Sequence, residues 1–260
     1  MGQKDREWFN DEEFWGQFAP VMFAETHWQE VSQVADGIIE MACQQAFENQ
    51  PKAGLKALDL CCGFGRISAE LARRGLAVTG VDITKSYLQT AKEEAAYENL
   101  DIEYIHADAR TFQRPDFFDL VVNLYISFGY FENQDEDILL LQNIYKSLRP
   151  GGIFIIETLG KEIAARDFIK GDCFERAGFN VFTEYEILDS WTRLKNNWTL
   201  VKDGKKIKKT FSQHLYSASE LQRLMLETGF AEIKTYGDWD KSPYDHRAAK
   251  LIMLGKKGLK

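Results

Sequence analysis

Leu58–Gly65 reads LDLCCGFG, and it lies between an apolar run that begins at Lys56 and the helical pattern RISAELARR at residues 66–74. A buried strand, a glycine turn and an amphipathic helix are predicted in that order. Glycines in such a turn let the backbone approach a ligand closely, and the helix N-terminus behind the turn favours polar or anionic groups. The stretch therefore predicts a strand–turn–helix unit that binds a ligand.

The same alternation of short apolar runs and helical patterns continues on the C-terminal side of this unit. Further strands are expected at 76–82, 101–108, 117–125 and 153–158, with helices at 85–99 and 135–148. Two last strands, AEIKTYG and KLIMLGK, flank the loop Asp238–Arg247. Strand–helix alternation of this kind predicts an α/β fold with a doubly wound, mostly parallel sheet. The final pair is expected to close that sheet as an antiparallel hairpin.

Two segments depart from the alternation. Residues 1–28 hold 7 aromatic side chains, and Asn10 with Glu13 resembles a helix cap. A second helix follows, with Val31, Val34, Ala35, Ile38 and Ala42 on one face. Three strands are predicted at 179–188, 191–201 and 206–216, the last two joined by the turn Asp203-Gly204. The chain thus divides into a helical cap (1–50), a core (51–158), an antiparallel β insertion (159–216) and a C-terminal helix and strands (217–260).

Three acidic residues stand at the ends of three consecutive predicted strands: Asp59, Asp82 and Asp108. Such strand ends line one crevice in an open α/β sheet. Asp82 follows Gly63 by 19 residues, where a carboxylate can accept both hydroxyls of a ribose. Asp108 could accept a hydrogen bond from an adenine amino group. Each acid alone could be a helix cap, but together they predict a nucleoside site.

The residues also separate two classes of nucleoside cofactor. A nicotinamide site would be expected to carry a third glycine where Ser68 stands. A pyrophosphate would be repelled by Asp59, whereas the ammonium group of a methionine tail would be attracted to it. The pattern therefore favours S-adenosylmethionine over NAD.

Together the motifs LDLCCGFG, GVD, HADAR, FDLVVNLY and RPGG resemble those of the class I S-adenosylmethionine-dependent methyltransferases, which have a Rossmann-like sheet. The resemblance covers roughly residues 50–158 and 217–257. Cys61 stands where this family usually has glycine. The resemblance implies a cofactor site made of a methionine end (Asp59, Cys61, Gly63, Gly65), a ribose and adenine end (Asp82, Ile83, Asp108, Ala109) and two residues under the sulfonium (Asn123, Leu124).

The sequence gives fewer specific signals for the methyl acceptor than for the cofactor. Enzymes of this family that methylate nucleic-acid bases carry a Pro-Pro turn where this chain reads Asn123-Leu124-Tyr125-Ile126. That difference and the net charge of −8 favour a small-molecule acceptor over nucleic acid. Candidate catalytic residues are His214, Tyr216 and Tyr125. Candidate substrate contacts are Trp15, Phe18, Phe128, Tyr130, Tyr244 and His246.

The sequence also lacks the patterns typical of metal sites, secretory signals and membrane-spanning segments. We expect no metal site, because the four histidines are scattered and no Cys-x-x-Cys pair is present. No secretory signal and no membrane-spanning run stand out, so a cytoplasmic protein without a membrane partner is expected. The oligomeric state stays open. Two alternatives to a methyltransferase remain, namely a non-catalytic module that binds S-adenosylmethionine and docks a partner, and an NAD-dependent oxidoreductase.

Overall fold

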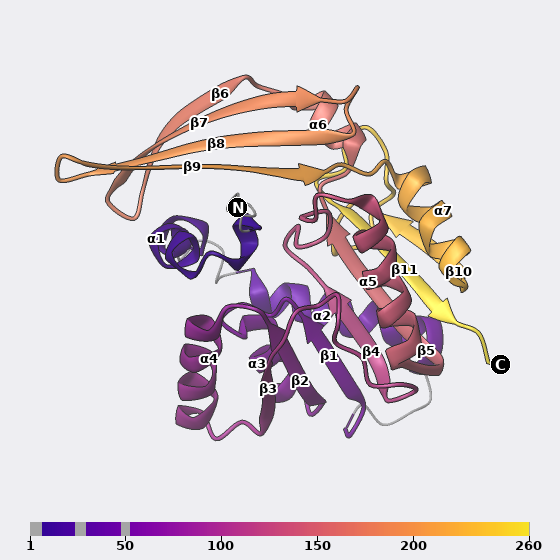
Figure 1. Ribbon diagram of the computed structural model, residues 1–260. Helices are drawn as coiled ribbons and strands as arrows, with labels where there is room; N and C mark the ends of the chain where they lie inside the picture. The colour runs from indigo at the N-terminus through magenta and orange to yellow at the C-terminus, as the bar shows by residue number, and fades with distance from the viewer. Residues whose placement is uncertain (1–6, 24–29, 48–52, 260) are drawn as a thin grey trace, which may run out of the picture.

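The central element is a seven-stranded sheet with the order β10-β11-β5-β4-β1-β2-β3 (Figure 1). The computed structural model describes residues 7–23, 30–47 and 53–259. The strands are β1 (Lys56–Leu60), β2 (Ala77–Asp82), β3 (Ile102–His106), β4 (Phe118–Asn123), β5 (Leu148–Thr158), β10 (Phe230–Tyr236) and β11 (Leu251–Lys257). The first five run parallel, and β11 is antiparallel to both β5 and β10. The predicted α/β fold with its closing hairpin is confirmed.

Helices cover both faces of this sheet (Figure 1). One face is covered by α2 (Val31–Ala42) and α3 (Arg66–Arg73), where Ile38 and Leu71 join the buried cluster around Val122. The other face is covered by α5 (Gln134–Ser147) and α7 (Ala218–Thr228), which bury Leu140 and Leu221 in the cluster around Phe154. The strands therefore have apolar residues on both faces, as parallel strands between two helix layers must. In the part of the chain that is described, no helix is long and apolar enough to span a membrane.

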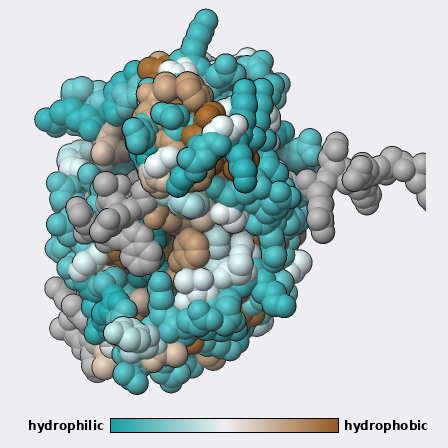
Figure 2. Space-filling view, turned by 90° about the vertical axis from the view of Figure 1, so that its left-hand side faces the viewer, coloured by the Kyte–Doolittle hydropathy of each residue, from teal (hydrophilic) through white to brown (hydrophobic). Residues whose placement is uncertain are grey.

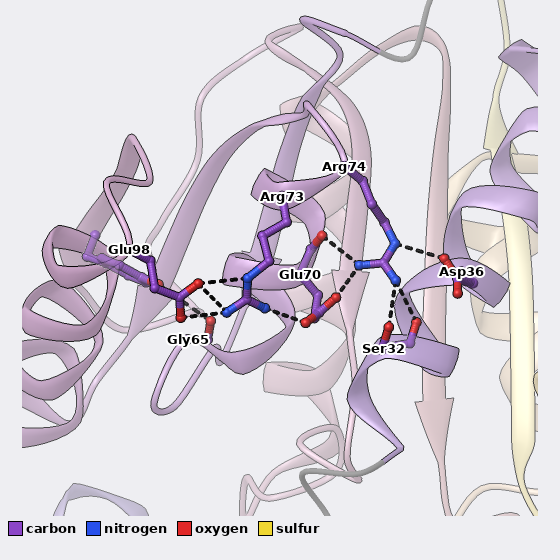
Figure 3. Close-up of polar contacts among 8 residues, drawn as sticks. Ser32, Asp36, Gly65, Glu70, Arg73, Arg74 and Glu98 are labelled. Atoms are coloured by element: carbon purple, nitrogen blue, oxygen red, sulfur yellow. Dashed lines mark hydrogen bonds and ion pairs between the residues drawn. The ribbon is translucent and has the colours of Figure 1, made fainter.

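Two adjacent arginines at the end of α3, Arg73 and Arg74, connect this helix to α2 and to the end of the next helix (Figure 3). Arg74 donates to the Asp36 carboxylate at 2.8 Å and to the Ser32 carbonyl at 3.0 Å, both in α2. Arg73 donates to Glu98, which follows α4 (Lys85–Tyr97), at 2.8 Å. Glu70 contacts both guanidinium groups. Exposed ion pairs contribute little singly, but this network links three helices behind the glycine turn.

A second sheet stands over the first and is built from the predicted insertion (Figure 1). After α6 (Lys161–Arg166), the strands β6 (Gly171–Arg176), β7 (Phe179–Leu188), β8 (Arg193–Lys202) and β9 (Lys205–His214) form an antiparallel sheet in sequential order, here called the meander. Asp203 and Gly204 both have positive φ, as the tight turn between β8 and β9 requires. The edge strand β6 and helix α6 were not predicted, because β6 is short and mostly exposed and shows no apolar alternation.

The N-terminal segment lies between the meander and the central sheet (Figure 1). It contains a short 3-10 helix, Trp8–Asn10, and α1 (Glu12–Met22), and a π-helical turn, Cys43–Phe47, follows α2. The prediction that Asn10 caps α1 is wrong, because the cap is Asp11, whose carboxylate accepts from the backbone N–H of Glu13 and Phe14. Asn10 instead donates to Glu7. At α7 a capping box forms, in which the Ser217 hydroxyl accepts from the Glu220 N–H and the Glu220 carboxylate accepts from the Ser217 N–H.

Candidate functional site

A cavity of about 800 Å³ lies between the carboxyl ends of the parallel strands and the inner face of the meander. Its floor comes from the ends of β1, β2, β3 and β4, and its roof from β7, β8 and β9. Figure 2 shows apolar side chains at the surface on the side of the molecule where the meander faces the core. Many of the residues predicted from sequence line this cavity, namely Asp59, Cys61, Gly63, Asp82, Ile83, Asp108, Ala109, Leu124, Tyr125, Trp15 and Tyr130.

The glycine turn keeps an open backbone despite its cysteine. Cys61 has φ of 64°, in the left-handed region that glycine adopts most easily, and Gly63 has φ of 55°. The turn therefore has the conformation expected of a glycine at position 61, with a thiol added. Gly65 (φ 72°) does not line the cavity, and a Cβ there would collide with the Tyr104 side chain. Gly65 thus allows α3 to begin close to β3.

Asp59 is buried at the end of β1 and lines the cavity. It accepts a hydrogen bond from the Ser68 hydroxyl at 2.6 Å. Burial raises the pKa of Asp59 to about 6, and the hydrogen bond from Ser68 partly opposes that rise. Ser68 thus stands where a nicotinamide site would have its third glycine, and its side chain binds Asp59.

The Asp82 carboxylate binds two loops, the glycine turn that follows β1 and the loop that follows β2. One carboxylate oxygen accepts from the Gly63 N–H at 2.8 Å and the other from the Thr84 N–H at 2.7 Å. Burial raises the pKa of Asp82, and these backbone hydrogen bonds oppose the rise. Each oxygen has a second lone pair and Asp82 lines the cavity, so the carboxylate can still accept hydroxyl groups.

Asp108 belongs to an ion network. Arg110 donates to Asp108 and also pairs with Glu7 and Glu136, each at 2.6 Å. These carboxylates raise the pKa of Arg110 further above its ordinary value. The network connects the N-terminal segment at Glu7 to the end of β3 and to α5. The Asp108 carboxylate is therefore committed mainly to Arg110.

The adjacent ends of β4 and β5 both contribute residues to the cavity wall. Asn123 is fully buried, donates to the Leu60 carbonyl at 3.0 Å and does not line the cavity. Tyr125 and Ile126 line it, both with positive φ, a strained conformation for bulky side chains. Burial raises the pKa of Tyr125 to about 12, so its hydroxyl can donate a hydrogen bond but is no base at neutral pH. Among the described residues that hydroxyl has no hydrogen-bond partner.

Glu157, near the end of β5, lines the cavity and was missed by the sequence analysis. It is 4% exposed, and among the described residues its carboxylate accepts only two long hydrogen bonds, from the Tyr125 N–H and from Lys250 Nζ, both at 3.4 Å. Burial raises the pKa of Glu157, and Lys250 opposes the rise. The signal was present, because Glu157 is an acid at a strand end like the three that were found.

Of the residues predicted for catalysis or for contact with the acceptor, six do not line the cavity: His214, Tyr216, Phe18, Phe128, Tyr244 and His246. His214 and Tyr216 bind the fully buried Asp137 of α5, with 2.9 Å from His214 Nδ1 and 2.6 Å from the Tyr216 hydroxyl. They tie the end of the meander to α5, which argues against a catalytic role.

The remaining four have structural partners of their own. Phe18 packs in the buried cluster between α1 and the meander, and the Phe128 ring lies 5.3 Å from that of Tyr216. The Tyr244 hydroxyl donates to Glu162, and the His246 carbonyl accepts from Arg166.

The roof of the cavity comes from alternate residues of the meander, none of which was singled out from sequence. Its lining residues from β7, β8 and β9 are Tyr185, Leu194, Asn196, Trp198, Phe211 and Gln213. Alternation along each strand predicts that such residues share one face. Which face covers the cavity depends on how the insertion folds back over the sheet, and this is a tertiary property. Within the described ranges, no group of three or more potential metal ligands is gathered.

This geometry agrees with the comparisons to known proteins. Residues 57–152 match a family model described as a methyltransferase domain. The stretch from β1 into β5 is thus similar to known methyltransferase domains. The ubiquinone biosynthesis O-methyltransferase of Caulobacter vibrioides is 34% identical over 117 residues, which are 44% of this chain and 45% of that protein. The chain thus spans less than half the length of this relative.

Solved structures match the chain over nearly its whole length. An S-adenosylmethionine-dependent methyltransferase from Clostridium acetobutylicum has a TM-score of 0.78 and 16% identity, covering 95% of this chain and 98% of that one. The amino pentose methyltransferase CalS10 from Micromonospora echinaspora, solved with S-adenosylmethionine bound, has a TM-score of 0.67 and 19% identity, covering 93% and 96%. At these identities the likeness establishes a common fold, which here extends beyond the central sheet.

Proposed function

We propose that this protein transfers a methyl group from S-adenosylmethionine to a small-molecule acceptor. One observation carries the proposal: the glycine turn and the acids Asp59 and Asp82 line the same cavity that the meander roofs. A cavity of about 800 Å³ falls within the usual range of small-molecule sites and has room for a nucleoside and a small partner.

The residues at the sheet end of the cavity fit this cofactor. Asp82 has lone pairs for the ribose hydroxyls, and Asp59 offers a carboxylate to the ammonium group. Ile83 and the Ala109 backbone offer an apolar face and an edge for adenine. Because Arg110 binds the Asp108 carboxylate, we assign the adenine edge to the Ala109 backbone rather than to Asp108. Bound there, S-adenosylmethionine would supply an electrophilic methyl group.

The acceptor is placed between the strand exits and the meander. Tyr125 and Tyr130 line this part with Glu157, and the N-terminal segment contributes Phe9 and Trp15. Methyl transfer requires alignment, exclusion of water and a deprotonated acceptor atom. We propose that Glu157 accepts the acceptor's proton, because it lines the cavity and its carboxylate, among the described residues, accepts only long hydrogen bonds. The cap (1–50) and the insertion (159–216) would together cover the acceptor.

The proposal is tested by incubating the protein with methyl-labelled S-adenosylmethionine and a fractionated cell extract. We expect label in the low-molecular-weight fraction, in keeping with the net charge of −8, which disfavours nucleic acid. Label confined to tRNA, rRNA, DNA or protein would contradict a small-molecule acceptor. Thermal stabilisation by S-adenosylmethionine without label in any fraction would support a non-catalytic module. Stabilisation by NAD alone would support an oxidoreductase.

A further inference from the structure

Two amide side chains lie on the otherwise apolar roof of the cavity. Asn196 of β8 is 6% exposed and Gln213 of β9 is 7% exposed, and both line the cavity. The other lining residues of these two strands are Leu194, Trp198 and Phe211. Amides in such surroundings are unusual, because burying them without partners costs folding free energy.

The hydrogen-bonding capacity of both amides is almost unused. Among the described residues, the Gln213 side chain has no hydrogen-bond partner, and Asn196 uses one N–H toward the Leu194 carbonyl at 3.3 Å. Neither amide has an atom among the fully enclosed side-chain atoms that lack a partner, so their unused donors and acceptors are open to the cavity and can bind a molecule that enters it. Each amide offers a carbonyl acceptor and N–H donors.

The strand register defines their spacing. Asn196 lies opposite Phe211 in β9 and opposite Tyr185 in β7, while Gln213 lies opposite Leu194. The two amides are therefore diagonal neighbours, and such neighbours are about 7–8 Å apart. That separation suits two substituents of one small molecule, with the Phe211 ring beside it.

The charge of this face is also informative. The residues of β7, β8 and β9 that line the cavity include no charged side chain. Arg176 of β6 also lines the cavity, but its guanidinium lies over the Phe174 ring at 4.8 Å and reaches the Val21 carbonyl at 3.5 Å. A phosphate or carboxylate is usually recognised by cations, whereas hydroxyl and carbonyl groups are recognised by neutral amides.

We propose that Asn196 and Gln213 bind two hydroxyl or carbonyl oxygens of the acceptor, which is a hydroxylated small molecule that is uncharged where it faces β8 and β9. This inference rests on the proposed methyl transfer. It adds that the meander selects the acceptor through these two amides, and it does not involve them in binding the cofactor.

The test uses Asn196→Leu and Gln213→Leu in the full chain, with Asn197→Leu and Ser212→Ala as controls. Asn197 and Ser212 are sequence neighbours of the two amides that do not line the cavity. Labelled methyl transfer to the low-molecular-weight fraction is measured at several extract concentrations, and affinity for S-adenosylmethionine is measured by calorimetry. We expect each amide variant to lose at least tenfold in rate at low extract concentration and to recover part of it at high concentration. Cofactor affinity should stay within twofold, and both controls should behave as the parent protein.

The outcomes separate the two proposals. If both amide variants transfer label at the parent rate, this inference is overturned and the proposed function is not. A labelled product that mass spectrometry shows to lack two hydroxyl or carbonyl oxygens would do the same. Absence of label with the parent protein would overturn the proposed function and this inference with it. Equal losses in the controls would assign the effect to the stability of the meander, which also contradicts the inference.

Discussion

The Asp82 carboxylate accepts a hydrogen bond from the Gly63 N–H at 2.8 Å, so the end of β2 holds the glycine turn that follows β1. An acid at this place in the sequence is expected to be an exposed ligand for ribose. In the structure it is 9% exposed and also binds the Thr84 N–H. The residue therefore has two roles, because the side chain that shapes the loop also faces the cavity.

Replacing Asp82 by alanine should weaken binding of S-adenosylmethionine at least tenfold and also lower the melting temperature. Hydrogen bonds to a charged group contribute about 1.5–3 kcal/mol each, and two buried N–H groups lose their partner. Calorimetry and thermal unfolding measure the two effects. Thr79→Val, in the same strand but outside the cavity, should leave affinity unchanged. An unaltered cofactor affinity in Asp82→Ala would remove the ribose assignment.

Asp59→Asn should stabilise the unliganded protein at neutral pH and weaken its affinity for S-adenosylmethionine. The pKa of Asp59 rises from 3.8 to about 6 on folding, so the folded state binds the proton more tightly. Stability should therefore fall as pH rises from about 4 to about 6, and above that range the full cost of the buried charge, about 3 kcal/mol, applies. In the variant, which keeps an acceptor for Ser68, this fall should disappear. Unfolding free energies between pH 4 and 8 test the sign, and a parent protein more stable than the variant at pH 8 would contradict it.

Glu157→Gln should slow labelled methyl transfer at least tenfold without altering cofactor affinity, because general bases typically contribute about 10²–10⁴ in rate. The groups that face Glu157 are Tyr125, Lys250 and Asp238. Since burial raises its pKa, the rate of the parent protein should fall on the acid side, and the variant should lose that dependence. Glu184→Gln, at an exposed position of β7, is the control. An unchanged rate and pH profile in Glu157→Gln would exclude this residue as the base.

Phe18→Ala should lower stability by about 3–5 kcal/mol through loss of buried contacts and the cavity left behind. Phe18 is fully buried, and its ring lies 6.3 Å from that of Trp198 in β8, so it holds α1 against the meander. Phe182→Ala, at a 44% exposed position on the outer face, should change stability little. If Phe18→Ala instead kept full stability and lost methyl transfer, the residue would be an acceptor contact, as the sequence alone suggests.

Tyr216→Phe should cost about 1–3 kcal/mol of stability while methyl transfer stays within twofold of the parent rate. The change removes the 2.6 Å hydrogen bond to Asp137 and leaves that buried carboxylate with His214 as its remaining partner in the described chain. Denaturant unfolding and the labelling assay measure the two quantities. The opposite pattern, lost transfer with full stability, would restore Tyr216 as a catalytic candidate.

The parallel sheet could be predicted from the sequence because its signals are local. Apolar runs such as the one around Val121, helical spacing and the glycine turn each reflect a few neighbouring residues. Strand ends then bring Asp59 and Asp82 to one edge, since parallel strands share their direction. The same reasoning extends to Glu157, whose strand was predicted even though its acid was not singled out.

The tertiary structure alone decided which residues enclose the acceptor. His214 and Tyr216 were chosen as polar groups near the end of the insertion, yet a buried partner on α5, Asp137, binds both. Asn196 and its neighbour Asn197 are identical in type, and only the pleat of β8 and the folding of the meander over the sheet place one of them in the cavity wall. The sequence by itself determined the strands, the glycine turn and the acids at the strand ends, because these depend on local periodicity and on a shared strand direction. Contacts between segments far apart in the chain determined the roof of the cavity, because hydrogen bonds and packing across such distances leave no periodic signal in either segment.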